Sequence, residues 1–375
     1  MTSPPAPASG ARATCPVEDM RVAAFRIPTE RPESDGTLEW TSTTLVVVEL
    51  TAAGHRGLGY TYASGACTKL INDALRELVC GADVFHVDGI TRTLFAQLRN
   101  QGRQGLVACA VSAIDCALWD LKAKLLGLPL VDLLGSVRHS APVYGSGGFT
   151  SYDDDTLRAQ LEDWAKIGIT RFKMKVGRDP DLDPDRVRIA RATIGPTAEL
   201  FVDGNGAYTP RRAIAAAHRF AAEADVSWLE QPLAIDDYDG LRFVRDHLPV
   251  GVELASGEYG YDLGAFRRLL CPGAVDVLMA DVTRCGGVTG LIKVGTLCET
   301  WHVPLSTHCA PSLHLHVACA LEPIRHIEYF HDHARIEHEL FDGAAEPRGG
   351  SVAPDRTRPG LGLEFKWVDA ERFAV

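Results

Sequence analysis

Three acidic residues follow one another through the second half of the chain, each at the end of a short apolar run. Asp203 ends "ELFVD", Glu230 ends "SWLE", and Glu258 follows "GVELASG". If these runs are neighbouring strands, the three carboxylates converge at one edge, and three oxygen ligands with room for water suit Mg²⁺. A lone acid at a strand end is usually a helix cap or a surface charge, and "VDGNG" by itself also fits a turn. Glu253 competes for the third position, but it lies near the start of its strand, so we prefer Glu258.

An acid and an imidazole follow at the next two strand ends. Asp281 ends "VDVLMAD" and His308 ends "VPLSTH". A carboxylate beside an imidazole fixes its tautomer and raises its basicity, which is typical of a general acid or base working near neutral pH. The alternative is a core histidine with a capping aspartate. We interpret five other histidines as structural or substrate-adjacent: His302, His314, His316, His331 and His333. The pair His331 and His333 could in principle bind a metal, but it lies past the strand end and has no period-matched partner.

Two lysines stand two positions apart in "RFKMKVG". Side chains two apart on a strand point the same way. Lys173 and Lys175 would therefore face one side of the strand. The other side would carry Phe172, Met174 and Val176, facing the surrounding helices. The alternative is a pair of solvated lysines on an edge strand, but charged groups that end six other runs at one period argue against it.

A repeating unit must position these side chains. From about residue 141 the chain has eight short apolar runs, and their polar ends lie roughly 20 to 28 residues apart, through Glu328 in "RHIEYF". That period suits one strand plus one crossover helix, and eight such parallel units close into a barrel whose active sites form at the C-terminal ends of the strands. An open doubly wound sheet is the alternative, but no glycine-rich phosphate turn follows the first run.

The first part of the chain has a different pattern. "MRVAAFRIP", "STTLVVVEL" and "HRGLGYTY" predict an antiparallel meander, and "LVACAVSAIDCALWDLKAKLLG" predicts a helix that packs against something large. We therefore predict an α/β protein with four parts: a disordered tail over 1–18, an α+β capping domain over 19–135, a catalytic barrel over 136–340, and a C-terminal segment over 341–375 that returns to the cap.

Composition limits the partners. The net charge of −11 disfavours nucleic acid and anionic membranes, so a small molecule is the expected ligand. Ten cysteines without a C-x-x-C pair indicate reduced thiols and a cytoplasmic location. No run approaches the length of a membrane helix, and the Pro- and Ala-rich start lacks the features of a secretion signal. We also expect a homo-oligomer, although no motif specifies an assembly.

The motifs together resemble the enolase superfamily, specifically its mandelate racemase subgroup, over nearly the whole chain. They are K-x-K, "VDGN", "WLEQP", "SGE", "DVTRCGGVTG", "STH" and "IEYF". The resemblance implies a modified (β/α)7β barrel under an α+β cap. It also implies Mg²⁺ on the three carboxylates, a base at Lys175 supported by Lys173, an Asp281–His308 dyad on the other face, and Glu328 as a protonated hydrogen-bond donor to the enolate. Substrate binding would involve Lys173, Asn205 and Glu328.

For Lys175 to act as a base, its pKa must fall, and we expect the neighbouring Lys173 ammonium and the metal to lower it. The dyad separates the chain from the muconate lactonizing and dipeptide epimerase branch, which carries lysine at the position of Asp281. Arg284 is similar to acid-sugar dehydratases of the subgroup, where mandelate racemase carries lysine.

The resemblance therefore implies dehydration of a sugar acid to a 2-keto-3-deoxy acid. Racemisation or epimerisation by 1,1-proton transfer is the first alternative, and a homologue that only binds ligand is a remote one, because all matched positions are filled. Specificity is expected from cap loops "PTERPESDGTLEWTS" and "GYTYASG", which would close over the barrel mouth.

Overall fold

Eight parallel strands form a closed barrel in the computed structural model, which describes residues 14–375. Neighbouring strands follow chain order, and the last strand pairs in parallel with the first, Ile327 opposite Val143. This closure excludes the open doubly wound sheet and confirms the predicted barrel. The strands are β4 (Ala141–Gly147), β5 (Arg171–Lys175), β6 (Glu199–Asp203), β7 (Val226–Glu230), β8 (Glu253–Ser256), β9 (Val277–Ala280), β10 (Leu305–Thr307) and β11 (Ile324–Phe330).

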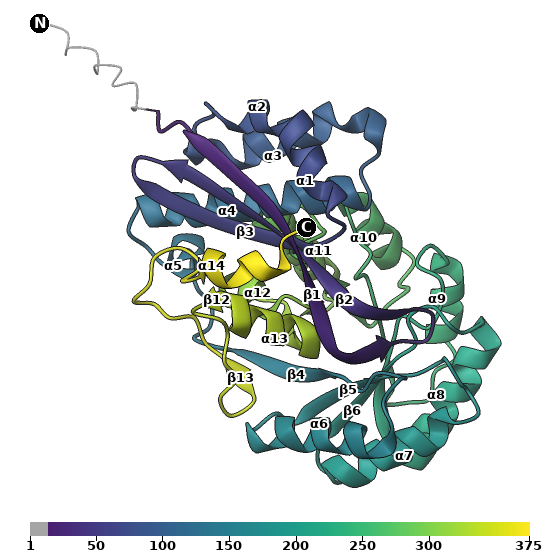
Figure 1. Cartoon of the computed structure of the whole chain (residues 1–375). Coiled ribbons are helices and arrows are strands. Elements are labelled where there is room, and N and C mark those ends of the chain that lie inside the picture. Colours follow the sequence, from purple (N-terminus) through teal and green to yellow (C-terminus); the bar gives the residue numbers. More distant parts are fainter. Residues whose placement is uncertain (1–13) are drawn as a thin grey trace, which may run out of the picture.

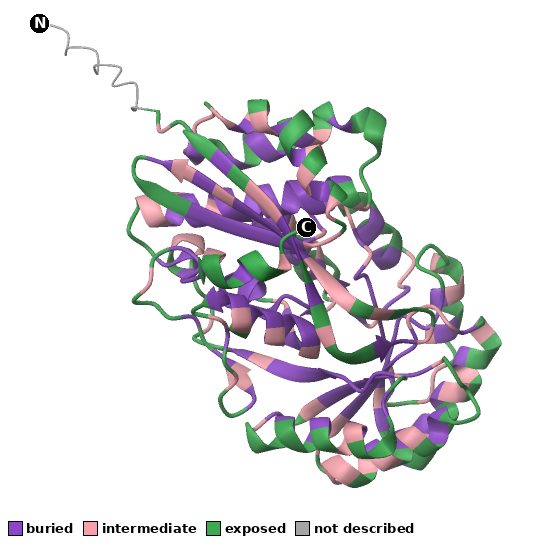
Figure 2. Cartoon of the chain, viewed as in Figure 1, coloured by how far each residue is buried: buried purple, intermediate pink, exposed green. Residues whose placement is uncertain are grey.

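The barrel strands are buried on both faces, which is why their sequences read as short, continuous apolar runs (Figure 2). Phe172 and Met174 belong to the core between strands and helices, as predicted for the outward face of β5. Below the polar strand ends, the barrel interior is filled by a separate cluster that includes Tyr144, Phe201 and Trp228. The site therefore rests on a packed floor.

Helices connect successive strands and cover the outside of the barrel (Figure 1). Several begin where an aspartate side chain caps the first turn; Asp153 accepts from the Thr156 amide at 2.9 Å, and Asp262 accepts from the Ala265 amide at 2.9 Å. The connecting helices are α6 (Asp154–Lys166), α7 (Asp183–Ile194), α8 (Pro210–Ala224), α9 (Tyr238–Arg245), α10 (Leu263–Leu270), α11 (Gly287–Trp301) and α12 (Pro311–Ala318).

A further helix, α13 (His331–Leu340), follows the eighth strand and links the barrel to the cap. The Tyr60 hydroxyl of the cap donates to Glu337 Oε1 at 2.6 Å, and the Thr43 hydroxyl donates to Asp332. α13 therefore fixes the cap over the barrel.

The cap has the predicted three-stranded antiparallel meander, β1 (Asp19–Ser34), β2 (Glu39–Ala52) and β3 (His55–Tyr62), packed on the predicted long helix α4 (Leu106–Leu125). Glycine at position 59 permits this packing, because a Cβ there would lie 2.1 Å from the Ala113 carbonyl oxygen. The cap also contains α1 (Ala66–Leu70), a π-helical turn (Ile71–Leu75), α2 (Arg76–Val79), α3 (Val87–Gln97), 3₁₀ turns at Val84–His86 and Arg99–Gln101, and α5 (Leu130–Leu134).

Two expectations about the cap need correction. The predicted loop over 28–42 is mostly the end of the β1–β2 hairpin, which continues to Ser34 and resumes at Glu39, with a register shift after Pro28. The predicted tail over 1–18 lies mainly outside the described residues, but its end is held against the cap: Val17 is buried, and its amide donates to the Ala82 carbonyl at 2.9 Å.

The end of the chain lies against the first strand of the cap. The Val375 amide donates to the Ala24 carbonyl at 3.1 Å, and the Phe365 ring centroid lies 5.2 Å from that of Phe25. Short elements lead there: β12 (Phe341–Asp342), β13 (Ser351–Val352), β14 (Glu364–Phe365), α14 (Trp367–Ala370) and a 3₁₀ turn (Glu371–Phe373).

All ten cysteines are free, as predicted. Within residues 14–375, no helix is both long and apolar enough to cross a membrane.

Candidate active site

Some of the polar strand ends line a cavity of about 220 Å³ at the C-terminal mouth of the barrel, closed on one side by the cap. The barrel side contributes Lys175, Asn205, Glu258, Tyr259, Arg284, His308, Cys309, Glu328, Phe330 and His333. The cap contributes Asp35, Trp40, Ser42, Thr43 and Tyr62, all within or directly beside the two predicted specificity segments.

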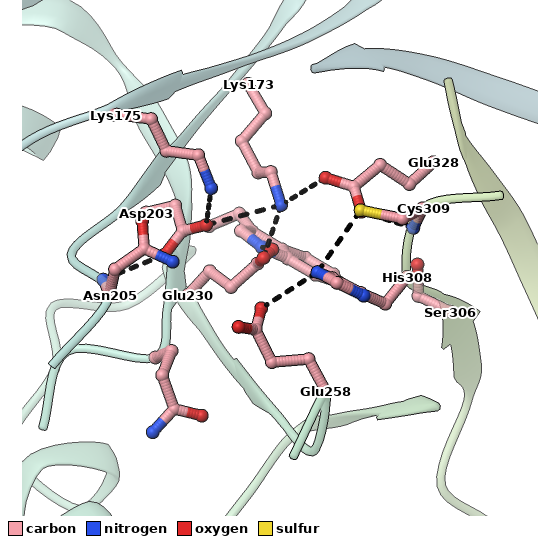
Figure 3. Close-up of polar contacts among 12 residues, drawn as sticks. Lys173, Lys175, Asp203, Asn205, Glu230, Glu258, Ser306, His308, Cys309 and Glu328 are labelled. Atoms are coloured by element: carbon pink, nitrogen blue, oxygen red, sulfur yellow. Dashed lines mark hydrogen bonds and ion pairs between the residues drawn. The ribbon is translucent and has the colours of Figure 1, made fainter. Parts of the chain in front are cut away.

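Both lysines point from β5 into a group of carboxylates (Figure 3). Lys173 Nζ contacts Glu230 Oε1 and lies 2.6 Å from Glu328 Oε1 and 3.5 Å from Asp203 Oδ2. Lys175 Nζ lies 2.6 Å from Asp203 Oδ2. The alternative of solvated edge lysines is wrong, because Lys173 is fully buried and Lys175 is 6% exposed.

Asp203, Glu230 and Glu258 each offer a carboxylate oxygen within 4.8 Å of the others, and all three are buried. Glu258 Oε2 is buried and accepts no hydrogen bond within the described part of the chain. A set of three carboxylates with one unused oxygen beside a cavity fits a hard divalent cation such as Mg²⁺. Glu253 lies at the other end of β8, where it pairs with Arg325, which supports the choice of Glu258.

The pKa values of both lysines are raised. Burial lowers the pKa of each amine, but Glu230 and Glu328 outweigh this effect at Lys173, and Asp203 outweighs it at Lys175. We expected the Lys173 ammonium and the metal together to lower the pKa of Lys175. Lys173 acts in that direction, while the carboxylates that would hold the metal shift the pKa upward. The combined effect of Lys173 and the metal stays a prediction.

His308 and Asp281 form the predicted dyad. His308 Nδ1 lies 2.9 Å from Asp281 Oδ2, so a proton on Nδ1 donates to the carboxylate and leaves the Nε2 lone pair toward the cavity. Burial raises the pKa of Asp281, but the hydrogen bond from His308 and the nearby Arg284 guanidinium outweigh this and hold it well below its usual range. The dyad therefore combines a fixed imidazole with an ionised carboxylate.

Glu328 lies beside two cationic or polar neighbours that favour its ionised form. Burial raises the pKa of Glu328. The Lys173 ammonium and His308 lower it by more than burial raises it, so the net pKa lies well below the usual range. Its Oε2 accepts a hydrogen bond from the Cys309 amide at 2.7 Å. As an acceptor it holds Lys173 and the Cys309 turn in place. Its expected role as a protonated donor to the enolate stays a prediction.

Asn205 follows Asp203 in the first turn after β6, and its backbone N–H donates to Asp203 Oδ1 at 2.9 Å. Its side chain lines the cavity, and its Oδ1 is buried without a hydrogen-bond partner among the described residues. This geometry leaves Asn205 able to accept from a hydroxyl-bearing ligand.

The sequence did not indicate a role for Cys309 or the contact between Tyr62 and His333. Cys309 Sγ lies 3.3 Å from His308 Nε2, and the Tyr62 ring stacks on His333 with centroids 3.4 Å apart. Cys309 and Ala310 both have positive φ, 52° and 40°, which turns the chain so that the Cys309 amide faces Glu328. Only the position of Cys309 directly after His308 could have signalled its role, because the stacking joins residues 271 positions apart.

The other histidines are structural, except that His333 also lines the cavity. His314 Nε2 accepts from the Val282 amide at 2.9 Å, and His316 Nδ1 accepts from the Val131 amide at 3.2 Å. His331 Nε2 lies 3.3 Å from Glu30 in the cap, and His302 ends α11 in a left-handed conformation.

Comparison with known proteins identifies the class. Residues 156–370 match the family model described as enolase C-terminal domain-like, and residues 21–135 match the N-terminal domain of mandelate racemase and muconate lactonizing enzyme. The chain belongs to the enolase superfamily, within the group that includes mandelate racemase, as its motifs predicted.

Particular relatives narrow the comparison. The chain is 33% identical to a 3,6-anhydro-alpha-L-galactonate cycloisomerase of Streptomyces coelicolor, over 93% of this chain and 98% of that protein. A mandelate racemase/muconate lactonizing enzyme-like protein from Rubrobacter xylanophilus superposes with a TM-score of 0.94 at 50% identity, covering 96% of this chain and 100% of that one. An L-talarate dehydratase from Polaromonas sp. JS666, complexed with Mg and L-glucarate, superposes with a TM-score of 0.86 at 30% identity, covering 96% and 98%.

Proposed function

We propose that this enzyme removes the proton next to the carboxylate of a sugar acid in a Mg²⁺-dependent reaction, and that it then eliminates the β-hydroxyl as water to give a 2-keto-3-deoxy acid. One observation carries the proposal. Lys175 and His308, on β5 and after β10, reach one small cavity from opposite sides, and a carboxylate cluster lies between them (Figure 3).

Asp203, Glu230 and Glu258 would hold the cation. A bound Mg²⁺ would supply positive charge that stabilises an enediolate and offsets the carboxylate charges that raise the pKa of Lys175.

The protein supplies further fixed charge for the intermediate. Removing the α-proton places a second negative charge on the substrate, which must meet preorganised donors. The Lys173 ammonium, buried and held between Glu230 and Glu328, is such a donor. We assign Glu328 to positioning Lys173, because its Oε1 lies 2.6 Å from Lys173 Nζ.

His308 and Lys175 divide the proton transfers. One group accepts the α-proton, and the group on the opposite side, or the same one, protonates the departing hydroxyl. Asp281 keeps His308 Nε2 free to accept or return that proton by holding Nδ1–H. Tyr62, Trp40 and the hairpin restrict water above the cavity.

Opening or closing of a ring is a second candidate, supported by similarity to two cycloisomerases, 3,6-anhydro-alpha-L-galactonate cycloisomerase and D-galactarolactone cycloisomerase, the latter 31% identical to this chain. The early chemistry is shared. If the β-oxygen belongs to a ring, it leaves carbon but stays in the molecule, so the product is an isomer and no water is lost. Racemisation is the third candidate function, since it also needs proton-transfer groups on opposite sides of the substrate, the positions that Lys175 and His308 occupy.

The test is a panel of mono- and diacid sugars, their lactones and their anhydro forms, incubated with Mg²⁺. A 2-keto acid lighter than its substrate by one water supports dehydration. A 2-keto product of unchanged mass from a cyclic substrate favours the cycloisomerase, and inversion at the α-carbon without a keto product across the panel favours the racemase.

A further inference from the structure

Cys309 places a thiol beside the imidazole that we assign to proton transfer. We propose that His308, Cys309 and Glu328 form a second metal site, separate from the three carboxylates, which takes a thiophilic divalent cation such as Zn²⁺ and thereby shuts the enzyme off reversibly. This inference does not depend on which reaction the cavity catalyses.

The nitrogen-to-sulfur distance fits a tetrahedral zinc centre. His308 Nε2 and Cys309 Sγ lie 3.3 Å apart, whereas a nitrogen and a sulfur on one tetrahedral Zn²⁺ lie about 3.5 Å apart, given bonds of about 2.0 and 2.3 Å. Glu328 supplies a carboxylate oxygen within 4.8 Å of both atoms. Figure 3 shows the three side chains converging. All three line the cavity, so a fourth position is open to water, as in zinc sites with three protein ligands.

The imidazole is already in the metal-binding tautomer. Asp281 holds Nδ1–H at 2.9 Å, which leaves the lone pair on Nε2.

Ligand softness separates the two sites. The carboxylate trio offers only hard oxygens, which suit Mg²⁺, while a thiolate and an imidazole suit Zn²⁺. No residue belongs to both groups. On binding, the Cys309 S–H bond breaks, the proton passes to solvent, and the thiolate bonds to the metal. Zinc then occupies the His308 lone pair and Glu328 together, which blocks proton transfer.

The test measures binding directly. Zinc chloride is titrated calorimetrically into the protein with saturating Mg²⁺, in two buffers of different ionisation enthalpy, for the wild type, Cys309→Ser and Cys271→Ser. Cys271 is exposed and far along the chain from the site, so its variant controls for the loss of one thiol. Loss of a residue that only hydrogen-bonds to a metal ligand lowers metal affinity by roughly 10- to 100-fold. Loss of the thiolate ligand itself should therefore weaken zinc binding by at least about 100-fold, and only in Cys309→Ser.

Two further readouts keep the test decisive. Proton release on zinc binding should disappear in Cys309→Ser, and Co²⁺ should give thiolate charge-transfer absorption in the wild type and in Cys271→Ser only. Cys309→Ala replaces the serine variant if circular dichroism shows that the latter is misfolded. Equal zinc affinity in all variants, displacement of zinc by Mg²⁺, or no zinc binding by the wild type would each overturn the second site.

Discussion

At the scale of single residues, the site consists of carboxylates that form ion pairs with two lysines. Lys173 lies among Asp203, Glu230 and Glu328, and Lys175 pairs with Asp203. Buried charges are stable only with partners, so each carboxylate both neutralises an ammonium and remains available as a ligand or acceptor. Changes of charge here should alter metal binding and proton transfer before they alter the fold.

The metal assignment predicts the behaviour of Glu230→Gln. In the wild type, Trp228 Nε1 donates to Glu230 Oε2 at 3.0 Å. Glutamine has the same shape as glutamate and can still accept this hydrogen bond, so the fold should persist. Loss of one carboxylate should weaken Mg²⁺ binding by at least about 100-fold, measured as the Mg²⁺ dependence of activity.

Glu253→Gln is the matched control, because it changes an acid at the far end of the next strand, β8. Its Mg²⁺ dependence should equal that of the wild type. Equal Mg²⁺ dependence of both variants, or full activity in excess chelator, would refute the carboxylate site.

The two-sided arrangement predicts opposite selectivity in heavy water. Each proton-transfer group exchanges the α-proton only of the configuration that faces it, so Lys175→Ala and His308→Asn should each lose exchange for one α-epimer by roughly 10² to 10⁴-fold and retain it for the other. NMR of the α-proton in both epimers measures this. If both variants lose exchange for the same epimer and keep it for the other, the two sides do not act independently.

The positions of these residues could be predicted from sequence, while their protonation could not. Strand ends repeat at a regular period, and parallel strands bring such ends together, so Asp203, Glu230 and His308 were predictable. The net pKa of Lys175 and of Glu328 depends on which charges lie within a few ångströms, and several of these come from other strands. The missed contact of Cys309 arises from a left-handed turn that no local pattern announced.

At the scale of elements, the β1–β2 hairpin is the part of the cap that closes the cavity. It brings Asp35 and Trp40 to the mouth, and it docks on the barrel through Ser34, whose carbonyl accepts from the Thr150 amide at 2.8 Å. We expected a loop here, and Pro28 and Pro32 do remove two ladder donors from the hairpin. The bulge after Pro28 and the docking contacts accommodate them, and those contacts join residues more than 100 positions apart.

Glu33 makes the docking of this hairpin depend on pH. Burial, together with the nearby Asp332 carboxylate, raises the pKa of Glu33 to about 8 from its ordinary 4.5. The folded state therefore favours the protonated form. This stabilisation is complete below pH 4.5, declines as the pH rises, and is lost once the pH passes about 8, a change of at most about 5 kcal/mol.

Thermal unfolding of Glu33→Gln between pH 5 and pH 9 tests this effect. The wild type should lose more stability over that range than the variant, whose amide does not ionise and still accepts from Trp40 Nε1. Glu39→Gln, on the exposed part of the same hairpin, is the control and should follow the wild type. Identical pH profiles for Glu33→Gln and the wild type would rule out this titration.

At the scale of the whole molecule, the barrel supplies the lysines, carboxylates and imidazole, and the cap covers the mouth above them. Substrate selection by the cap stays a prediction. Barrel closure was predictable because eight apolar runs of similar period leave few alternatives. The contacts between cap and barrel, such as Tyr60 with Glu337 and Tyr62 with His333, were not, since they join segments far apart in sequence. The oligomeric state stays a prediction.

The most direct test of the central claim is loss of the α-proton itself. The sugar-acid panel is incubated with the enzyme in heavy water, with Mg²⁺ or with excess chelator, and the α-proton signal is followed by NMR. We predict that at least one acid loses this signal with Mg²⁺, by exchange or by conversion to a 2-keto acid, and that none does so in chelator. Retention of the α-proton by every acid of the panel with Mg²⁺ present, or equal loss with and without the metal, would contradict Mg²⁺-dependent proton abstraction.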